Sequence, residues 1–377
     1  MNVVFVDDEP LILKGIKRAF YNSQWQIHLS QSGMEALSIL KQHDIDIVVT
    51  DMRMPQMDGA ELLETVTNDY PDVVRIVLSG HSNEEAAKRA SFVAHQWFNK
   101  PCDPKMLHQA IKHIEQVRKL FPDSNLRAMV GKIKSLPSPP KTYMQLNILL
   151  KDNSISMDKI GKLISDDPGL SAKILQLTNS SFFVQGNYIY CINEAIKRLG
   201  LDIVCSIVIA AELYSQMESL PGFSLENEQA RSLSTARLAA SLVDTSLEQE
   251  TLLVGLFHNL GNLILCEVNP DLMATYINKR ENIKDIVELE QSLFHVDHTQ
   301  LSGYLLHLWN FPYNLIENVL LHQQPEKLIQ YDFGSSAAVY IARCLLEQRE
   351  PEPNFVKHFN LEDKLASWQD RANNYAY

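Results

Sequence analysis

Residues Asp51–Gly59 read DMRMPQMDG and directly follow the apolar run Ile45–Thr50, which reads IDIVVT. A short β-branched run of this kind predicts a strand that is buried on both faces of a parallel sheet. Pro55 and Gly59 mark a turn after it, so Asp51 should project from the carboxyl end of the strand. Ligands bind at that edge of open α/β sheets, although one aspartate there is usually only turn chemistry.

Three further predicted strands end in polar residues: Val3–Val6 before Asp7-Asp8, Val73–Leu78 before Ser79, and Gln96–Asn99 before Lys100-Pro101. Amphipathic helical stretches separate the strands, at Leu11–Phe20, Gly33–Gln42, Ala60–Asp69 and Glu84–Ala94. This alternation predicts a doubly wound α/β fold, whose right-handed crossovers place successive strand ends at one edge. Three carboxylates, a hydroxyl and an ammonium group should therefore converge.

These residue types are suited to phosphoryl chemistry. Carboxylate oxygens are the ligands that Mg²⁺ prefers, usually one or two of them together with phosphate oxygens. The ion would offset the repulsion between the carboxylates and leave one free to attack a phosphoryl group. Lys100 would add a positive charge, and Ser79 a hydroxyl donor, for the transferred oxygens.

In these elements and their order, residues 1–121 resemble the receiver domain of two-component response regulators. The resemblance implies a five-stranded parallel sheet, with Asp51 as the phosphoacceptor and a sensor histidine kinase as the donor. It implies a Mg²⁺ site formed by Asp7, Asp8 and Asp51, and a cis Lys100-Pro101 bond. Ser79 and Lys100 would contact the phosphoryl group. Trp97 stands where receivers usually have Tyr or Phe, so it is either a switch residue or a side chain packed on the last receiver helix.

Composition sets limits on the class of protein. A length of 377 residues predicts two domains, and 45% hydrophobic with 21% charged residues is typical of a soluble protein. A net charge of −12 argues against a nucleic-acid partner. The five cysteines include no CxxC pair, no signal-peptide pattern is present, and the longest apolar stretch, Ile203–Ala211, is too short for a bilayer. We expect a cytoplasmic protein without a membrane partner.

The pattern changes after a boundary near Phe121–Ser124. We expect a linker at 122–125 and an all-α output domain at 126–345, because long 3.6-residue periods follow without clear strands. Asp166-Asp167-Pro168 is a strong helix start, with a carboxylate cap before a proline in the first turn. Residues 346–377 form a C-terminal extension. We expect it to contain one helix that packs on the output domain, and we prefer this interpretation to a surface for a partner.

Several segments of the output domain resemble the HDOD domain: Leu163–Ser180 (LISDDPGLSAKILQLTNS), Ile192–Gly200 (INEAIKRLG) and His298–Pro312 (HTQLSGYLLHLWNFP). HDOD domains resemble HD phosphohydrolases in their all-α fold. The resemblance implies a regulatory output domain without hydrolase activity that acts through a downstream protein partner. Family analogy also allows a homodimer formed through the receiver.

The residues depart from those an HD hydrolase needs. His258 is followed by Asn259, within the predicted helix Glu248–Glu267, where the enzymes carry a metal-binding aspartate. Their later His-His pair reads His322-Gln323. We therefore expect His258, Asn259, His298 and His322 to be remnants that hold no cofactor and catalyse no reaction. Loss of a residue that only supports a metal ligand already weakens metal binding, and here ligands themselves are missing. The alternative is a receiver-regulated, metal-dependent phosphohydrolase that uses His258, His298 and His322 in a non-standard ligand set.

Overall fold

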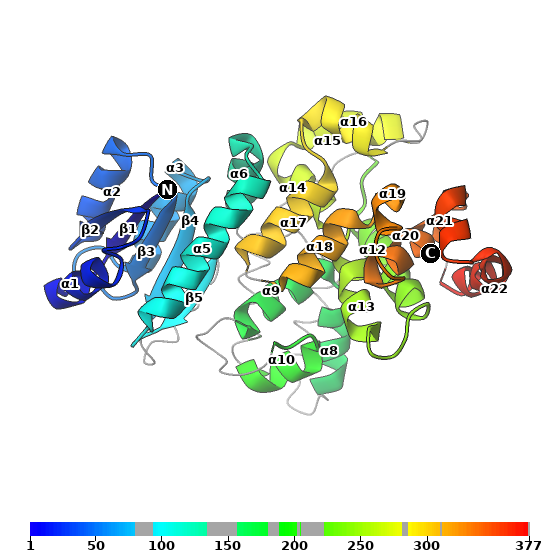
Figure 1. Ribbon diagram of the computed structural model, residues 1–377, viewed down its shortest axis with the longest axis horizontal. Coiled ribbons are helices and arrows are strands. Elements are labelled where there is room, and N and C mark those ends of the chain that lie inside the picture. The colour runs from blue at the N-terminus through cyan, green and yellow to red at the C-terminus, as the bar shows by residue number, and fades with distance from the viewer. Residues whose placement is uncertain are drawn as a thin grey trace. The chain divides into compact units, whose positions relative to one another are not determined.

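The computed structural model contains two compact units, one built chiefly from Met1–Lys134 and the other chiefly from the residues after it (Figure 1). It describes residues 1–79, 93–133, 157–179, 188–201, 204, 222–280, 286–309 and 311–375. Among the helices described, none combines the length and the hydropathy that a membrane span requires.

The first unit is a five-stranded parallel sheet in the order β2-β1-β3-β4-β5. The strands are β1 (Asn2–Val6), β2 (Gln26–Ser30), β3 (Ile47–Asp51), β4 (Val74–Ser79) and β5 (Gln96–Asn99). The helices described are α1 (Pro10–Ala19), α2 (Gly33–Gln42), α3 (Gly59–Asp69), α5 (Pro104–Leu120) and α6 (Ser124–Gly131). The predicted doubly wound fold is confirmed, whereas the predicted helix Glu84–Ala94 falls almost wholly outside the described residues.

The order of the strands explains which helices share a face of the sheet. The chain moves from β1 to β2 in one direction and from β2 through β3 in the other, so right-handed crossovers put α1 and α2 on opposite faces. Phe20, just after α1, stacks on His108 of α5 with ring centroids 5.8 Å apart. Helices α2 and α3 contact each other on the other face. Every residue of β3 is buried, as its apolar sequence predicted.

Helix α6 belongs with the first unit, although the sequence placed residues from 126 onward in the output domain. Arg127 of α6 pairs with Asp72 before β4, with Nε 2.7 Å from Oδ1. It also donates from Nη1 to the carbonyl of Phe121 at 2.8 Å. These polar contacts join α6 to the receiver sheet, and composition alone gave no sign of them.

The deepest link between the sheet and α6 is Arg75 of β4, which is 1% exposed. Its Nη2 donates to the carbonyl of Gly131 at the end of α6 at 2.8 Å, and its Nε donates to Val93 at 2.6 Å. The same Nη2 lies 2.7 Å from Nε2 of His95. A buried cation held by carbonyl groups fixes where α6 begins to leave the receiver.

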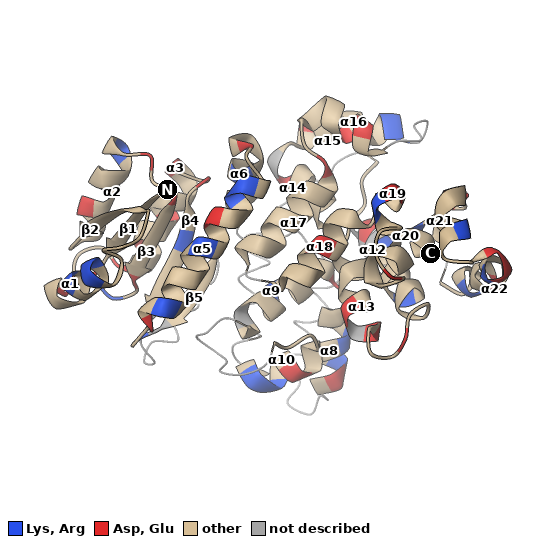
Figure 2. Cartoon of the chain, in the orientation of Figure 1, with Lys and Arg blue, Asp and Glu red and all other residues tan. Residues whose placement is uncertain are grey.

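The second unit is helical throughout its described part. Its helices are α8 (Met157–Ser165), α9 (Pro168–Thr178), α10 (Ile192–Leu199), α12 (Leu225–Ala240), α13 (Glu248–Phe257), α14 (Leu260–Val268), α15 (Pro270–Arg280), α16 (Ile286–Phe294), α17 (His298–Leu308), α18 (Tyr313–Leu321), α19 (Pro325–Leu328), α20 (Ser335–Leu346), α21 (Pro353–His358) and α22 (Glu362–Asn373). Asp167 caps α9, since its Oδ1 accepts from the amide of Leu170 at 2.9 Å. Figure 2 shows basic and acidic residues interspersed on these helices, as on α8 and α10.

Two helices occupy the C-terminal extension, where the sequence predicted one. Pro353 begins α21, and Asn360, with a positive φ of 52°, ends it before α22 starts. Phe355 is fully buried against Tyr340 of α20, with ring centroids 4.8 Å apart. The extension is therefore packed on the output domain through aromatic contacts.

Replacing Arg75 by methionine should lower the stability of the full-length protein by at least about 3 kcal/mol, because buried carbonyl groups lose their donor. Urea unfolding monitored by tryptophan fluorescence measures this change. Arg198→Met, which removes an exposed ion pair with Glu194, should cost less than about 0.5 kcal/mol. Equal effects of the two substitutions would show that Arg75 is not a structural link.

Candidate functional site

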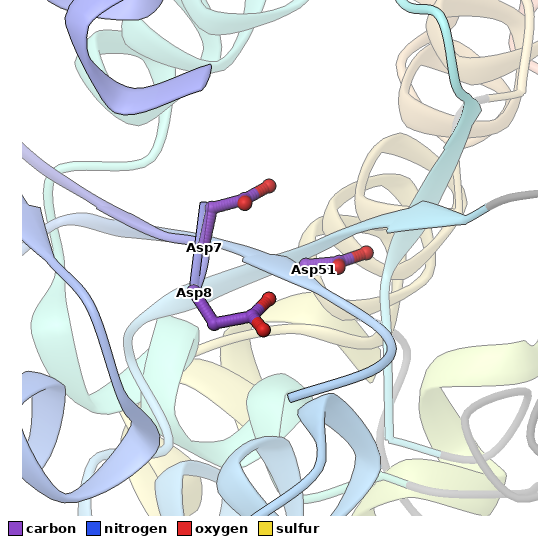
Figure 3. Close-up of side chains that lie close together, drawn as sticks. All are labelled: Asp7, Asp8 and Asp51. Atoms are coloured by element: carbon purple, nitrogen blue, oxygen red, sulfur yellow. The ribbon is translucent and has the colours of Figure 1, made fainter. Parts of the chain in front are cut away.

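Three carboxylates meet at the carboxyl edge of the sheet. Asp7 and Asp8 follow β1, Asp51 ends β3, and one oxygen of each lies within 4.8 Å of the others. Figure 3 shows the three side chains extending to the same side of the strands. Asp7 is 1% exposed and Asp51 9%, whereas Asp8 is the most open of the three. The predicted convergence of these side chains is therefore observed.

Strand pairing explains why they meet. β1 pairs with β3 in parallel, with Val6 opposite Thr50, so the next residue of each strand is an aspartate at the same level. Gly59 at the start of α3 packs against this point, and a Cβ atom there would lie 2.2 Å from the carbonyl oxygen of Asp51. Only glycine allows the loop 52–58 to return so close to the strand.

Lys100 joins two of the carboxylates. Its Nζ lies 2.7 Å from Oδ2 of Asp7 and 3.0 Å from Oδ1 of Asp51. Asp51 Oδ1 also accepts from the amide of Met52 at 2.7 Å, and Asp7 Oδ1 accepts from the amide of Glu9 at 2.9 Å. The Lys100-Pro101 peptide is cis, as expected.

Burial and the neighbouring charges shift the pKa values of this group. Burial raises the pKa of Asp51 above its ordinary value, and the hydrogen bond from Lys100 only partly opposes it. Burial by itself lowers the pKa of Lys100, but hydrogen bonds to Asp7 and Asp51 outweigh that effect and raise it. Lys100 is therefore charged at neutral pH and acts as a fixed cation beside the carboxylates.

Two predicted site residues are less fully described. Ser79 ends β4 opposite Asn99, but its side chain lies outside the described residues. Trp97 in β5 is 4% exposed and stands opposite Val77. That burial agrees with a packed side chain, and a switching role for Trp97 stays a prediction.

The second unit brings together the histidines singled out in the sequence. The predicted helix Glu248–Glu267 is wrong as a single element, because it breaks at His258-Asn259 into α13 and α14. Asn259 leaves helical geometry there, with φ −108° and ψ 13°. The ring centroid of His322 lies 5.2 Å from that of His258 and 5.9 Å from that of His298. All three rings are at most 1% exposed.

Five of the six ring nitrogens of these histidines lie against protein groups, and His258 Nε2 is the exception among the described contacts. His258 Nδ1 donates to the carbonyl of Gly255 and His322 Nδ1 to that of Val319, each at 2.6 Å. His298 lies between Glu290, 2.6 Å from its Nδ1, and Gln323, 2.6 Å from its Nε2. Among the described residues, the aspartate cluster of the receiver is the only group of His, Cys, Asp and Glu whose ligand atoms come close enough for a metal.

Sequence reasoning missed Arg343 of α20. It is 6% exposed, its Nη1 lies 3.3 Å from Nε2 of His322, and its Nη2 lies 3.3 Å from Glu347. Burial and this guanidinium lower the pKa values of His258 and His322 well below the ordinary value. The only feature of the sequence that could have indicated this arginine is its spacing of four residues from Glu347 on an otherwise apolar helix, which is typical of an ion pair.

Two family models match the chain: the response regulator receiver domain over residues 3–112 and the HDOD domain over residues 136–325. An uncharacterized protein of Treponema pallidum is 26% identical over 202 residues, which cover 52% of this chain and 39% of the relative. Sensor kinase CckA of Brucella abortus is 34% identical over 115 residues, or 30% of this chain and 12% of the kinase. The chain thus spans less than half the length of these curated relatives.

Among solved structures, the MmoQ response regulator of Methylococcus capsulatus is similar with a TM-score of 0.51 and 21% identity, covering 62% of this chain and 98% of that one. At that identity the likeness concerns the fold alone. The HDOD model alone spans half of the chain, and the receiver model covers the carboxylate site. The chain therefore belongs to the HDOD family and is a response regulator that combines a receiver domain with an HDOD domain.

Proposed function

We propose that Asp51 accepts a phosphoryl group from a sensor histidine kinase and that the modified receiver controls a non-catalytic HDOD domain. The observation that supports this most directly is the position of Lys100, which bridges Asp7 and Asp51 at 2.7 and 3.0 Å. A cation at this position can donate charged hydrogen bonds to the oxygens of an incoming phosphoryl group.

The two oxygens of Asp51 have different surroundings. Oδ1 is held by Lys100 and by the amide of Met52, whereas Oδ2 has no hydrogen bond to any residue that the structure describes. Oδ2 is therefore the nucleophile. It attacks phosphorus, the P–N bond of the kinase phosphohistidine breaks, an aspartyl phosphate forms, and the imidazole keeps the electron pair.

Asp7, Asp8 and Asp51 fit a hard divalent cation, because three carboxylate oxygens lie together at the edge of the site. Mg²⁺ would be held by these residues and would stabilise charge on the phosphoryl oxygens. Asp8, the most exposed carboxylate, would be the first point of contact for the ion. Asp7 and Asp51 are largely buried, which limits the access of water to the reacting atoms.

Phosphorylation changes the charge balance around Lys100. A phosphoryl group brings about −1.5 to −2 charges, so Lys100 would move its contacts from Asp7 to the phosphoryl oxygens. A change from a 1:99 to a 99:1 population of two states needs about 5.5 kcal/mol of preference for the new state. A single charged contact at this partly buried site contributes less free energy than that, so several contacts to the phosphoryl group must form together.

The HDOD domain acts through a protein partner in this proposal and carries out no reaction. Asn259 stands in place of a ligating carboxylate, and Arg343 lies against His322. A permanent cation beside the imidazoles opposes the entry of a divalent metal. The geometry gives no support to the alternative of a phosphohydrolase using His258, His298 and His322.

An apolar groove beside Lys100 suits the approach of the kinase. Its volume is about 470 Å³, and it lies between α1 and α5, with Ile12, Ile16 and Leu107 among its walls. Ala19 at the end of α1 also lines the groove and is exposed. A helix of the kinase that fills the groove would bring its phosphohistidine to the same edge as Asp51.

Asp51→Asn should abolish phosphoryl transfer, because the amide cannot act as the nucleophile. The measurement is incorporation of ³²P from a phosphorylated sensor kinase and, separately, from acetyl phosphate. Asp58→Asn is the matched control, since asparagine can still cap α3, where Asp58 accepts from Glu61. Unchanged labelling of Asp51→Asn would assign the acceptor elsewhere.

Magnesium should stabilise the wild-type protein and have much less effect on Asp51→Asn. Because the folded pKa of Asp51 is raised, its contribution to stability is present at low pH and is lost as pH rises through that pKa. Without metal at pH 7, Asp51→Asn should therefore melt at a higher temperature than wild type. Saturating Mg²⁺, at about 100 times its Kd, should add about 2.7 kcal/mol to wild type. Calorimetry that found equal shifts in both proteins would remove Asp51 from the metal site.

Ala19→Glu should slow labelling by the kinase about tenfold or more, because Ala19 is an exposed wall residue of the apolar groove and a charge there opposes docking. Labelling by acetyl phosphate should stay unchanged, since the small donor needs no groove. Met34→Glu is the control, because Met34 is 58% exposed on α2, on the opposite face of the sheet. If both variants lose kinase labelling equally, the groove is not the docking surface.

A further inference from the structure

A small cavity lies at the histidines of the second unit and goes beyond the proposed function. Its volume is about 50 Å³, with walls from α12, α14, α15, α17 and α20. Since one water needs roughly 10–15 Å³ of such space, the cavity holds about four oxygen-sized atoms. That is the size of one tetrahedral oxyanion.

The charges around the cavity favour an anion. Three arginines, Arg231, Arg280 and Arg343, and two glutamates, Glu228 and Glu347, line the cavity. Just behind this lining, Glu290 contacts His298 and Arg349 pairs with Glu347, so the formal balance stays at one positive charge. Arg280 lies 3.4 Å from Glu228, and Arg343 lies 3.3 Å from Glu347. Burial raises the pKa of Glu347, but Arg343 and Arg349 outweigh it and lower that pKa, so Glu347 is ionised.

The histidines present acceptors to the cavity. A carbonyl oxygen only accepts, so the Nδ1 of His258 must carry the proton it donates to Gly255. Burial and Arg343 hold the pKa of His258 well below its ordinary value, so the ring is neutral and its Nε2 is a bare acceptor. His258 therefore offers a lone pair to whatever occupies the cavity.

Two buried polar atoms at the cavity lack partners. Asn262 is 6% exposed and its Oδ1 has no hydrogen bond, and the same holds for Nε of Arg343, also 6% exposed, among the residues described. Both side chains line the cavity. An unpaired buried acceptor and an unpaired buried donor destabilise the protein unless a ligand or water satisfies them.

We propose that this cavity is a binding site for a small oxyanion that keeps a hydroxyl proton, with inorganic phosphate as the natural member of the class. Arg343 takes the place of a metal as the cation of the site. Its Nε, with Arg231 and Arg280, faces the anionic oxygens. His258 Nε2 and Asn262 Oδ1 each accept from one of the two hydroxyl groups of dihydrogenphosphate, the singly charged form of the ion.

The pattern of donors and acceptors separates phosphate from sulfate. Dihydrogenphosphate offers two unprotonated oxygens to the arginines and two hydroxyl groups to the two acceptors, whereas sulfate at neutral pH has no proton to donate. A site with buried acceptors rejects a ligand that leaves them unpaired. Phosphate should therefore bind at least about tenfold more tightly than sulfate at equal ionic strength.

The test is isothermal titration of the full-length protein with inorganic phosphate, in EDTA so that the receiver carboxylates hold no metal. We expect one saturable site. Arg343→Met should weaken it about 10- to 100-fold, because charge-assisted hydrogen bonds are lost. Asn262→Leu should weaken it about 2- to 10-fold while the ligand-free protein melts at the same or a higher temperature, because the unpaired acceptor is gone.

Arg198→Met removes an exposed cation from the same unit and should leave the affinity unchanged. Binding that survives both Arg343→Met and Asn262→Leu, or equal affinity for phosphate and sulfate, overturns the proposal. If Arg343→Met fails to fold, Asn262→Leu and the comparison with sulfate decide. The titration is done in EDTA, and the substituted residues all lie in the second unit. A negative result would therefore leave the phosphorylation of Asp51 unaffected, and a failure of that phosphorylation would leave this site unaffected.

Discussion

The ion pairs of Lys100 with Asp7 and Asp51 are the interaction on which the receiver depends. Carboxylates brought together by adjacent strands repel one another, and burial makes that repulsion costly. Lys100, held at the end of β5, offsets it without filling the site, because its side chain is still 22% exposed. In the proposed function, the same cation would contact the oxygens of a phosphoryl group on Asp51.

Arg343 is a cation beside the histidines of the HDOD domain, as Lys100 is beside the carboxylates of the receiver, but the charge of Arg343 opposes the binding of a metal ion. It is almost fully buried, and it lies against His322 and Glu347. A guanidinium stays charged at all relevant pH values and is not displaced by a metal as a proton would be. The pocket therefore holds three buried histidines beside a permanent positive charge, the arrangement from which the anion site is proposed.

Buried polar contacts also decide where the receiver ends. Arg75 and Arg127 bind α6 to the strand β4 and to the residue before it. The chain thus leaves the receiver through a helix that is fixed to the sheet. Arg75 thus links β4 directly to the end of α6 by a hydrogen bond.

Local residue patterns were enough to predict the doubly wound fold and the aspartate site, because β-branched strands and carboxylates at strand ends can be recognised from short segments. The sequence located four strands from their residues, whereas β2 (Gln26–Ser30) mixes polar with apolar residues at the edge of the sheet and was implied only by resemblance. Tertiary structure decided the break at His258-Asn259, the attachment of α6 and the role of Arg343. Those features rest on contacts between residues distant in the chain, such as Arg75 with Gly131, and periodicity carries no information about them.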